Sequence, residues 1–452
     1  LGGSKDPLES EAERVLKQTF LLDCVTRTDG LYAVDLDERR RIESRVELDF
    51  ETLYGQPLSQ RFTSHMQIPF SRVEDLVPNW GLGAHMLPEA TSIEHLPYLV
   101  DDLALIRVHR KSEIEQPDSP MALDPPQPEP QNAITRSTRG ASPVQTAPYI
   151  KPPQTGAVEQ VWIGDGTPIG AGKAVREAYE NRLDRIPAIG DIDIKVVCND
   201  AEMGEEEGLI NDIYGSRDDV SFYTTIHRNL TKDELTNVLR KPTDFLHYIG
   251  HIDSGGFECS DGKLDIGTVD EVGVASFLLN ACQSYSQGTE LIKKGGIGGI
   301  VTLSDVINSS AVRMGKHLAR LLNNGFPLYA ALDIAKKESL MGGRYIVLGD
   351  GRMALTQSQS VPTLCELELR TNRDIDFTYI TYPTARIDLG SMTLPLLENI
   401  DTHFLVSQLV PSLNPTLDEL EDFLQMENYP LILNGTLQWS NEIDGFEARD
   451  RS

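Results

Sequence analysis

The stretch that decides the fold is VASFLLNACQSYSQG, residues 274–288. Its first half is mostly apolar and lacks the alternation of a strand that faces water on one side, so we expect a strand that is buried on both faces. The apolar run stops at Asn280-Ala281-Cys282, and polar residues follow up to Gly288. A buried strand therefore ends by presenting a cysteine to a polar turn.

Strand-like and helix-like segments alternate on both sides of this stretch. The expected strands span 158–166, 191–200, 220–229, 244–252, 274–282, 296–306 and 344–351, and the expected helices span 170–183, 201–215, 231–241, 288–295, 310–325 and 327–339. Because the strands are apolar and are separated by helices, the pattern predicts an α/β sandwich. Its sheet is expected to be mostly parallel and covered by helices on both faces.

Composition divides the rest of the chain. Residues 1–113 mix helical and strand-like pieces, which predicts an N-terminal α+β region. Residues 114–157 are rich in Pro, Ser, Thr and Gln and poor in large apolar residues, which predicts a disordered linker. The sandwich is expected over 158–356. Residues 357–452 contain several strand-like segments and one helix-like segment, which predicts a smaller β-rich part.

Length, hydropathy and cysteine content restrict the class of protein. A chain of 452 residues has room for two or three domains. It has no apolar stretch of about 18 residues or more, and its first residues, LGGSKDPLESEAE, lack a signal-peptide pattern. The five cysteines form no CxxC motif and no Cys/His metal spacing. We therefore expect free thiols, no metal, no membrane association and a cytoplasmic location.

Charge is the strongest compositional signal. Asp and Glu together number 69 against 41 Lys and Arg, so the formal net charge is -28. The acidic residues are spread along the chain, and Arg outnumbers Lys by 27 to 14. This composition predicts adaptation to molar salt and a halophilic source, since counter-ions screen the repulsion among acidic groups. Without a basic stripe to neutralise phosphates, we expect no nucleic-acid partner.

The chemistry is expected where the strands end, because ligands of a parallel sheet bind at the carboxyl ends of its strands. The strand 244–252 ends around His251, and the strand 274–282 ends at Cys282. Consecutive strands usually pair, so both side chains are expected at one rim. There an imidazole can deprotonate a thiol and make it a nucleophile.

Other residues near these strand ends keep the assignment open. Cys198 ends another expected strand, and Cys259 lies in a hairpin that an Asp-Gly pair predicts. Either one becomes the candidate thiol if the strand boundaries shift. His247 lies inside its strand and is expected to be a core histidine with a hydrogen-bond partner.

Four segments together resemble the CHAT family of caspase-like cysteine peptidases, relatives of caspases and separases. They are FLHYIGHID (245–253), FLLNACQSY (277–285), GGIVTLSDV (298–306) and YIVLGDG (345–351). The resemblance covers roughly 158–356 and implies a caspase-like three-layer sandwich. In that family one strand carries the catalytic histidine, and a pattern of a small residue, Ala, Cys, any residue and Ser carries the nucleophile. The match implies His251 as the base and Cys282 as the nucleophile. Cys282-Gln283 is also similar to the caspase signature.

The sequence departs from the family pattern at three points. Ile252 follows the histidine where the family usually has Gly, and its β-branched side chain is expected to crowd the substrate. The separation of the two candidate residues, 282 − 251 = 31, is shorter than the roughly fifty residues typical of caspases. The turn at 349–351 is Gly-Asp-Gly where the family more often has Gly-Asp-Pro.

The resemblance implies a cysteine endopeptidase that cleaves a protein or peptide through a Cys-His dyad and a thioacyl-enzyme intermediate. The backbone N–H groups of Ile252 and Cys282 are implied as the oxyanion hole, and no cofactor is implied. An activating partner or a fused domain is expected to regulate the enzyme. Asp200 and Asp305, at the ends of flanking strands, are candidates for an acidic substrate pocket that accepts Arg or Lys.

Two other classes of function remain open. The first is a catalytically silent caspase-like scaffold or signalling module, which Ile252 supports. The second is a doubly wound domain that binds a small ligand, in which Cys282 has a structural role. That second class does not explain why a cysteine and a histidine occupy the ends of successive strands.

The acidic surface is expected to make folding depend on salt. We predict a higher melting temperature in molar KCl than in dilute buffer, because screening relieves the repulsion among the 28 excess negative charges. Thermal unfolding followed by circular dichroism measures this difference. A melting temperature that is unchanged or lower in molar KCl would exclude the halophilic interpretation.

Overall fold

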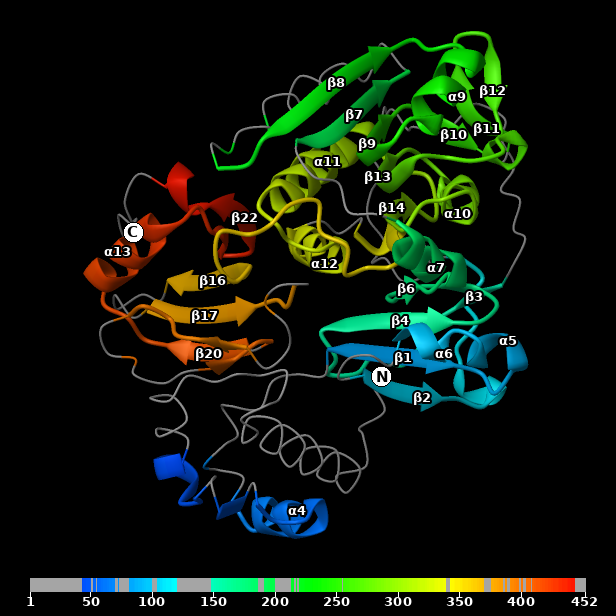
Figure 1. The fold of residues 1–452 in the computed structure, drawn as a ribbon. Coiled ribbons are helices and arrows are strands. Elements are labelled where there is room, and N and C mark those ends of the chain that lie inside the picture. The colour runs from blue at the N-terminus through cyan, green and yellow to red at the C-terminus, as the bar shows by residue number, and fades with distance from the viewer. Residues whose placement is uncertain are drawn as a thin grey trace. The chain divides into compact units, whose positions relative to one another are not determined.

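The computed structural model describes most of the chain outside its N-terminal part (Figure 1). The described residues are 43–49, 52–53, 55–69, 72, 81–99, 104–119, 148–185, 191–199, 213–214, 217, 219–253, 255–338, 342–369, 375–384, 387, 391–397, 400, 404–407 and 409–443. They fall into two compact units. One comprises Leu1–Gly81 with Thr363–Ser452, and the other comprises Leu82–Pro362.

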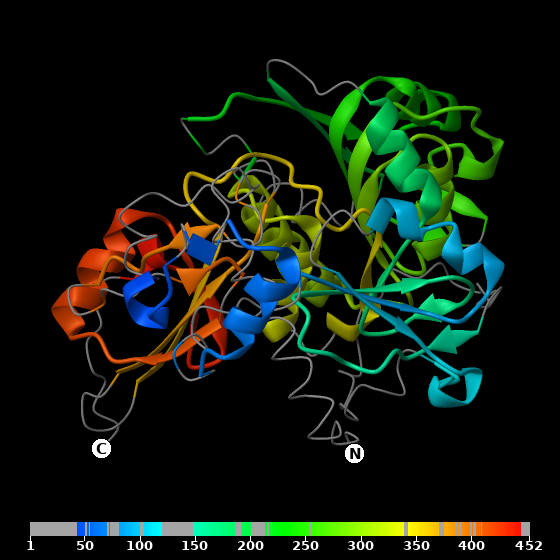
Figure 2. The same ribbon diagram turned by 60° about the horizontal axis from the view of Figure 1, so that its bottom comes forward.

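The unit Leu82–Pro362 is built on a ten-stranded sheet (Figures 1 and 2). In spatial order its strands are β2 (Ala104–Val108), β1 (Leu82–Met86), β4 (Glu159–Ile163), β6 (Gly172–Lys173), β15 (Tyr345–Gly349), β14 (Gly298–Thr302), β13 (Val274–Asn280), β9 (Thr243–Ile249), β7 (Ile192–Cys198) and β8 (Phe222–Arg228). Every neighbouring pair is parallel except β14 and β15. Two parallel blocks of opposite direction therefore meet at that one junction.

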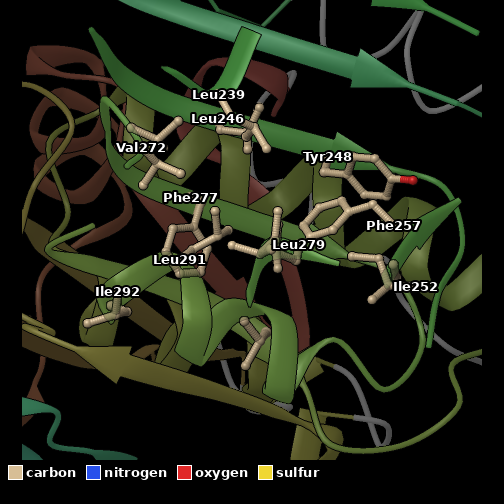
Figure 3. Close-up of a cluster of buried hydrophobic side chains, with 14 of the residues drawn as sticks. Leu239, Leu246, Tyr248, Ile252, Phe257, Val272, Phe277, Leu279, Leu291 and Ile292 are labelled. Carbon is tan, nitrogen blue, oxygen red and sulfur yellow. The ribbon is translucent and has the colours of Figure 1, made fainter. Parts of the chain in front are cut away.

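Helices cover both faces of the sheet. On one face lie α7 (Arg176–Asp184), α9 (Lys232–Arg240) and α10 (Tyr285–Lys293), and on the other lie α11 (Asn308–Asn323) and α12 (Leu328–Glu338). Figure 3 shows the first interface, where Phe277 and Leu279 of β13 lie in one apolar cluster with Leu239 and Leu291 of the helices. The predicted α/β sandwich with a mostly parallel sheet is confirmed.

The alternation of side chains along β13 assigns each residue to a face. Phe277 and Leu279 belong to the cluster with α9 and α10. Asn280 points the other way, because its amide donates to the backbone oxygen of Ala311 in α11, at 2.8 Å. Since successive strand residues point to opposite faces, the even-numbered residues of β13 face α11.

A three-stranded hairpin sheet follows directly after β9. It consists of β10 (Ile252–Asp253), β11 (Gly256–Cys259) and β12 (Gly262–Leu264). Glycine is required at the start of β11, where Gly256 has a φ of 118° and a Cβ would lie 2.1 Å from the Leu264 carbonyl oxygen. The Asp-Gly turn expected between the last two strands is present, and Gly262 there has a φ of 131°.

Local signals also explain α9. Thr231 caps the helix: its hydroxyl accepts a hydrogen bond from the N–H of Glu234, and the Glu234 carboxylate accepts one from the N–H of Thr231. This capping box fixes the start of the helix at the predicted residue. The helix expected over 201–215 lies outside the described residues except for 213–214.

The division of the chain differs from the predicted one at two places. Residues 82–108, expected in a separate N-terminal region, supply β1 and β2 to the ten-stranded sheet, because the five residues of β1 are all buried beside β4. The end of the expected linker is also ordered, since β3 (Tyr149–Ile150) pairs with β5 (Thr167–Pro168). Residues 120–147 of that linker lie outside the described residues.

The other unit contains the expected β-rich part. Its five-stranded sheet has the order β20 (Leu409–Leu413), β17 (Ile375–Thr381), β16 (Thr363–Leu369), β21 (Pro430–Leu433) and β22 (Thr436–Trp439). The helix α13 (Leu417–Met426) buries Leu420 and Phe423 against apolar residues of this sheet. Further described elements of this unit are α4 (Leu58–Met66), β18 (Met392–Thr393) and β19 (Phe404–Leu405).

The Gly-Asp-Gly turn lies at the edge of the sheet opposite to the ends of β9 and β13, because β15 runs antiparallel to β14. Asp350 of this turn is buried and accepts a hydrogen bond from Arg182 at 2.8 Å. Burial and the nearby Asp350 raise the pKa of Glu159 to about 8. The turn therefore belongs to a buried charged cluster and is remote from the predicted catalytic rim.

Candidate active site

The pairing of β9 with β13 carries the two candidate catalytic residues to equivalent positions. The strands are parallel neighbours, and the register pairs Leu278 with His247 and Asn280 with Ile249. His251 lies two residues beyond Ile249, and Cys282 lies two residues beyond Asn280. Neighbouring strands are about 4.8 Å apart. The register therefore carries both candidate residues past the same edge of the sheet.

The chain turns sharply at the cysteine. Gln283 has a φ of 50°, in the left-handed region, and α10 begins two residues later at Tyr285. The Cys282 side chain is only 1% exposed. Its sulfur accepts a hydrogen bond from the N–H of Val306 at 3.1 Å and lies 3.7 Å from the Val306 carbonyl oxygen. In this structure the thiol is buried beneath residues that follow β14.

We call residues 303–306 the cover segment, because they follow β14 and end at Val306, whose backbone contacts the Cys282 sulfur. Side-chain hydrogen bonds hold its middle: the Gln283 amide donates to the Asp305 carboxylate at 2.9 Å, and the Arg344 guanidinium donates to the Asp305 carbonyl at 2.6 Å. Its first N–H, of Leu303, donates to the carbonyl of Arg344 at 2.7 Å. Arg344 is itself buried, so one arginine fixes the cover segment at two points.

His251 is half-buried and follows the last residues of β9. Its carbonyl oxygen accepts the N–H of Glu258 at 3.0 Å, and the Tyr248 hydroxyl lies 3.2 Å from the same oxygen. Tyr248 is fully buried and packs edge-on against Phe257, with ring centroids 4.7 Å apart. The hairpin and this tyrosine therefore fix the backbone that carries the imidazole.

The side chain of Ile252 is directed into the core, where it is 1% exposed and belongs to the apolar cluster with Tyr248 and Phe257 (Figure 3). We had expected this β-branched side chain to crowd the substrate. That expectation is wrong, because the side chain is buried in the core. The bond from Glu258 to His251 makes Ile252 and Phe257 a non-hydrogen-bonded pair of the hairpin. In such a pair the N–H groups point away from the partner strand, so the Ile252 N–H is not used by β11.

The two candidate pocket carboxylates have different outcomes. Asp305 lies in the cover segment, where its carboxylate accepts the hydrogen bond from Gln283, the residue after the nucleophile. It is partly exposed. Asp200 lies outside the described residues. Of the two, only Asp305 can be placed beside Cys282.

The competing thiols occupy less suitable positions. Cys259 is buried in β11, and burial together with the nearby Asp261 raises its thiol pKa to about 11, which disfavours the thiolate. Cys198 is buried as the last residue of β7, level with Ile249 of β9, and so lies within the ladder of the sheet. His247 is fully buried with its Nδ1 3.3 Å from the Tyr214 hydroxyl, as expected for a core histidine.

Sequence reasoning missed the residues that surround the turn, namely Val306, Arg344, Thr302 and Ser284. Ser284 was visible within the Cys-x-Ser pattern, but nothing in that pattern indicated a role for its side chain. Arg344 lies 62 residues beyond Cys282 (344 − 282 = 62), and no local pattern connects them. Among the described residues, no helix is long and apolar enough to cross a membrane, and no three His, Cys, Asp or Glu side chains are grouped to hold a metal ion.

This chain is similar to some solved structures, but only with low sequence identity and low TM-scores. No family model matches, and no curated protein matches at a significant level. A Saccharomyces cerevisiae separase–securin complex matches 43% of this chain and 16% of the other chain, with 13% identity and a TM-score of 0.32. The chain thus spans about one sixth of the length of that protein.

Two further structures match a larger share of both chains, and the first of them is from Porphyromonas gingivalis. A complex of the pro- and mature domains of RgpB matches 74% of this chain and 94% of the other, with 9% identity and a TM-score of 0.41. The Arg-specific cysteine proteinase gingipain R matches 75% of this chain and 92% of the other, again with 9% identity and a TM-score of 0.41. At these low scores and identities, no conclusion about the chemistry of this chain follows from the likeness.

The cover segment is expected to limit chemical access to Cys282. In the wild-type protein, iodoacetamide should alkylate Cys282 slowly, as mass spectrometry of peptides will show. Arg344→Ala and, separately, Gln283→Ala should each accelerate this alkylation about ten- to a hundredfold, because a lost hydrogen bond to a charged group weakens the closed state by about 1.5–3 kcal/mol.

The matched control is Arg185→Ala. The Arg185 guanidinium likewise donates to backbone carbonyls, those of Gly273 and Thr243, but at the opposite edge of the sheet. This variant should alkylate at the wild-type rate. If Cys282 in the folded wild-type protein reacts as fast as in urea, the thiol is not covered.

Proposed function

We propose that this chain is a cysteine endopeptidase of the caspase-like class, similar to the CHAT family, and that His251 and Cys282 form its catalytic dyad. The observation that carries the proposal is the register of β9 and β13, which sets the two residues at equivalent positions past the ends of paired strands. A base and a thiol are thus available within one small region.

The mechanism follows from this placement. His251 takes the proton of the Cys282 thiol, and the sulfur attacks the scissile carbonyl carbon to form a carbon–sulfur bond. The carbon–nitrogen bond then breaks, and His251 returns the proton to the leaving amine. A water molecule, deprotonated by the same imidazole, attacks the thioester, and the sulfur leaves with its proton restored.

Backbone N–H groups supply the oxyanion hole in this proposal. The candidates are the N–H of Cys282, in the turn, and that of Ile252, which the hairpin ladder does not use. A donor of this kind contributes about 3 kcal/mol to transition-state stabilisation. The apolar Ile252 side chain is compatible with this role, because it is buried in the core and leaves the N–H side of the backbone to the substrate.

The covered thiol supports a regulated enzyme. Cys282 can attack a substrate only if the cover segment moves, because its sulfur is hydrogen-bonded to Val306 and is 1% exposed. A partner protein or a fused domain that displaces residues 303–306 would expose the thiol. The structure is then a resting form, and the substrate is a protein or peptide. Asp305, beside the turn, is the remaining candidate for a pocket that accepts a basic side chain.

A catalytically silent scaffold is the second candidate, and the burial of Cys282 is the observation that favours it. In that case the thiol is a permanent core residue and the cover segment never opens. The buried Ile252 side chain no longer supports this alternative, because it does not obstruct the rim.

Replacement of the dyad provides the test. Cys282→Ala and His251→Ala should each abolish cleavage of casein, because one removes the nucleophile and the other its base. The measurement uses the full chain in molar KCl. Each variant is made in two backgrounds, the wild-type sequence and Arg344→Ala, and the second weakens the cover segment. Cys259→Ala and Cys198→Ala serve as matched controls and should retain cleavage.

Each outcome assigns the function differently. Cleavage by the Cys282→Ala protein at the wild-type rate would reject this nucleophile, and loss on Cys259→Ala instead would move it to the hairpin. If Arg344→Ala exposes the thiol to iodoacetamide but no variant cleaves casein, the scaffold is favoured.

A further inference from the structure

Two buried hydroxyl groups surround the turn that carries Cys282. Ser284 follows the nucleophile by two residues, and Thr302 is the last residue of β14, the neighbour of β13. Both are 0% exposed. The proposed chemistry does not use either side chain, although buried polar groups at such a position are costly unless they are fully hydrogen-bonded.

The hydrogen bonds of these hydroxyls form a closed set. The Ser284 hydroxyl donates to the carbonyl of Leu279 at 3.1 Å and accepts the N–H of Thr302 at 2.9 Å. The Thr302 hydroxyl donates to the carbonyl of Ala281 and accepts the N–H of Ser284 at 3.3 Å. The two hydroxyl oxygens also lie 3.2 Å from one another, where either can donate. A hydroxyl has a single proton, so a hydroxyl that donates to its carbonyl acts only as an acceptor toward the other hydroxyl.

The Ala281 carbonyl, which accepts the Thr302 hydroxyl, links this hydrogen-bond set to the backbone of Cys282. It belongs to the same peptide unit as the N–H of Cys282, because the bond between these residues joins the Ala281 carbonyl carbon to the Cys282 nitrogen. A trans peptide is planar, and its C=O and N–H point in opposite directions. Whatever holds the Ala281 oxygen therefore also sets the direction of the Cys282 N–H.

We propose that Thr302 is a positioning residue that aims the Cys282 N–H at the oxyanion of the reaction. Its hydroxyl holds the Ala281 oxygen from inside the core and so fixes the peptide plane, with the N–H directed away from Thr302. The residue acts through this peptide and does not touch the substrate. The inference rests on the proposed peptidase function, in which that N–H stabilises the developing negative charge.

Ser284 provides the contrast. Its hydroxyl is equally buried and bonds to the Leu279 carbonyl and to the N–H and hydroxyl of Thr302, but none of these contacts is with the Ala281–Cys282 peptide. Removing either hydroxyl takes one hydrogen-bond partner from a buried carbonyl and one from a buried N–H. The Ser284 and Thr302 variants should therefore lose similar amounts of folding free energy. Only the loss of the Thr302 hydroxyl frees the peptide plane.

The experiment compares Thr302→Val, Thr302→Ser and Ser284→Ala in the full chain. Valine has the shape of threonine without the hydroxyl, and serine restores the hydroxyl. For each variant we measure casein cleavage, the rate at which iodoacetamide alkylates Cys282, and the melting temperature. Alkylation is a displacement at carbon that develops no oxyanion, so it reports the thiol without the oxyanion hole.

Thr302→Val is expected to lower kcat by about ten- to a hundredfold, because a misdirected donor loses part of the stabilisation that one oxyanion N–H supplies. KM and the alkylation rate should stay within about threefold of wild type. Thr302→Ser should recover most of kcat. Ser284→Ala should lose a similar amount of stability and retain most of kcat.

Equal losses of kcat in Thr302→Val and Ser284→Ala would overturn the proposal, and so would a parallel loss of alkylation, because both point to general loosening of the turn. A crystal structure of Thr302→Val keeps the test independent of the proposed function. If neither the wild-type protein nor Arg344→Ala cleaves casein, the peptidase assignment fails, whereas an Ala281–Cys282 peptide that keeps its orientation without the hydroxyl rejects the role of Thr302.

Discussion

The parallel pairing of β9 with β13 is the constraint on which the candidate site depends. A strand pair fixes both the level and the face of every residue it contains, and a slip of one residue moves each side chain to the other face. With Asn280 opposite Ile249, the chain carries Cys282 and His251 past the sheet edge together. The buried residues of β13 hold this register, since Phe277 and Leu279 fill one helix layer and Asn280 bonds to the other.

Around this pair, two sets of hydrogen bonds act on the same turn in opposite ways. The Ser284 and Thr302 hydroxyls lie beneath it and fix its backbone, which is what a preorganised nucleophile requires. The cover segment lies over the thiol and bonds to the sulfur itself through Val306, which opposes catalysis. In the proposed enzyme a partner would have to move only the cover segment, because the two hydroxyls already fix the turn.

Part of this arrangement could be predicted from the sequence. Continuous apolar strands between helices, such as 274–280, indicated a parallel sheet, and the polar turn after them indicated the rim. The apolar pattern does not encode strand direction, so the reversal between β14 and β15, which places Asp350 at the opposite edge, was not visible. β1 escaped prediction because its five residues include a buried histidine, His85, and resemble no apolar run.

The surroundings of the thiol could not be predicted for a related reason. Arg344 contacts Asp305 only because β15 returns antiparallel to β14 and brings the residue before it to the catalytic rim. Ile252 was expected to face a substrate because the pattern shows residue type and not side-chain direction. Its burial beside Phe257 follows from the hairpin, which the Asp-Gly turn predicted without specifying how it packs.

The pH dependence of Cys282 alkylation tests most directly whether His251 and Cys282 act on one another. It requires no knowledge of the substrate, and the Gln283→Ala background weakens the cover segment so that access does not limit the rate. Around neutral pH, His251→Ala should lower the alkylation rate about tenfold or more, because the thiol loses the base that takes its proton. At high pH, where a thiol ionises without a base, the rates of the two proteins should converge. Superimposable profiles with and without His251 would contradict the account.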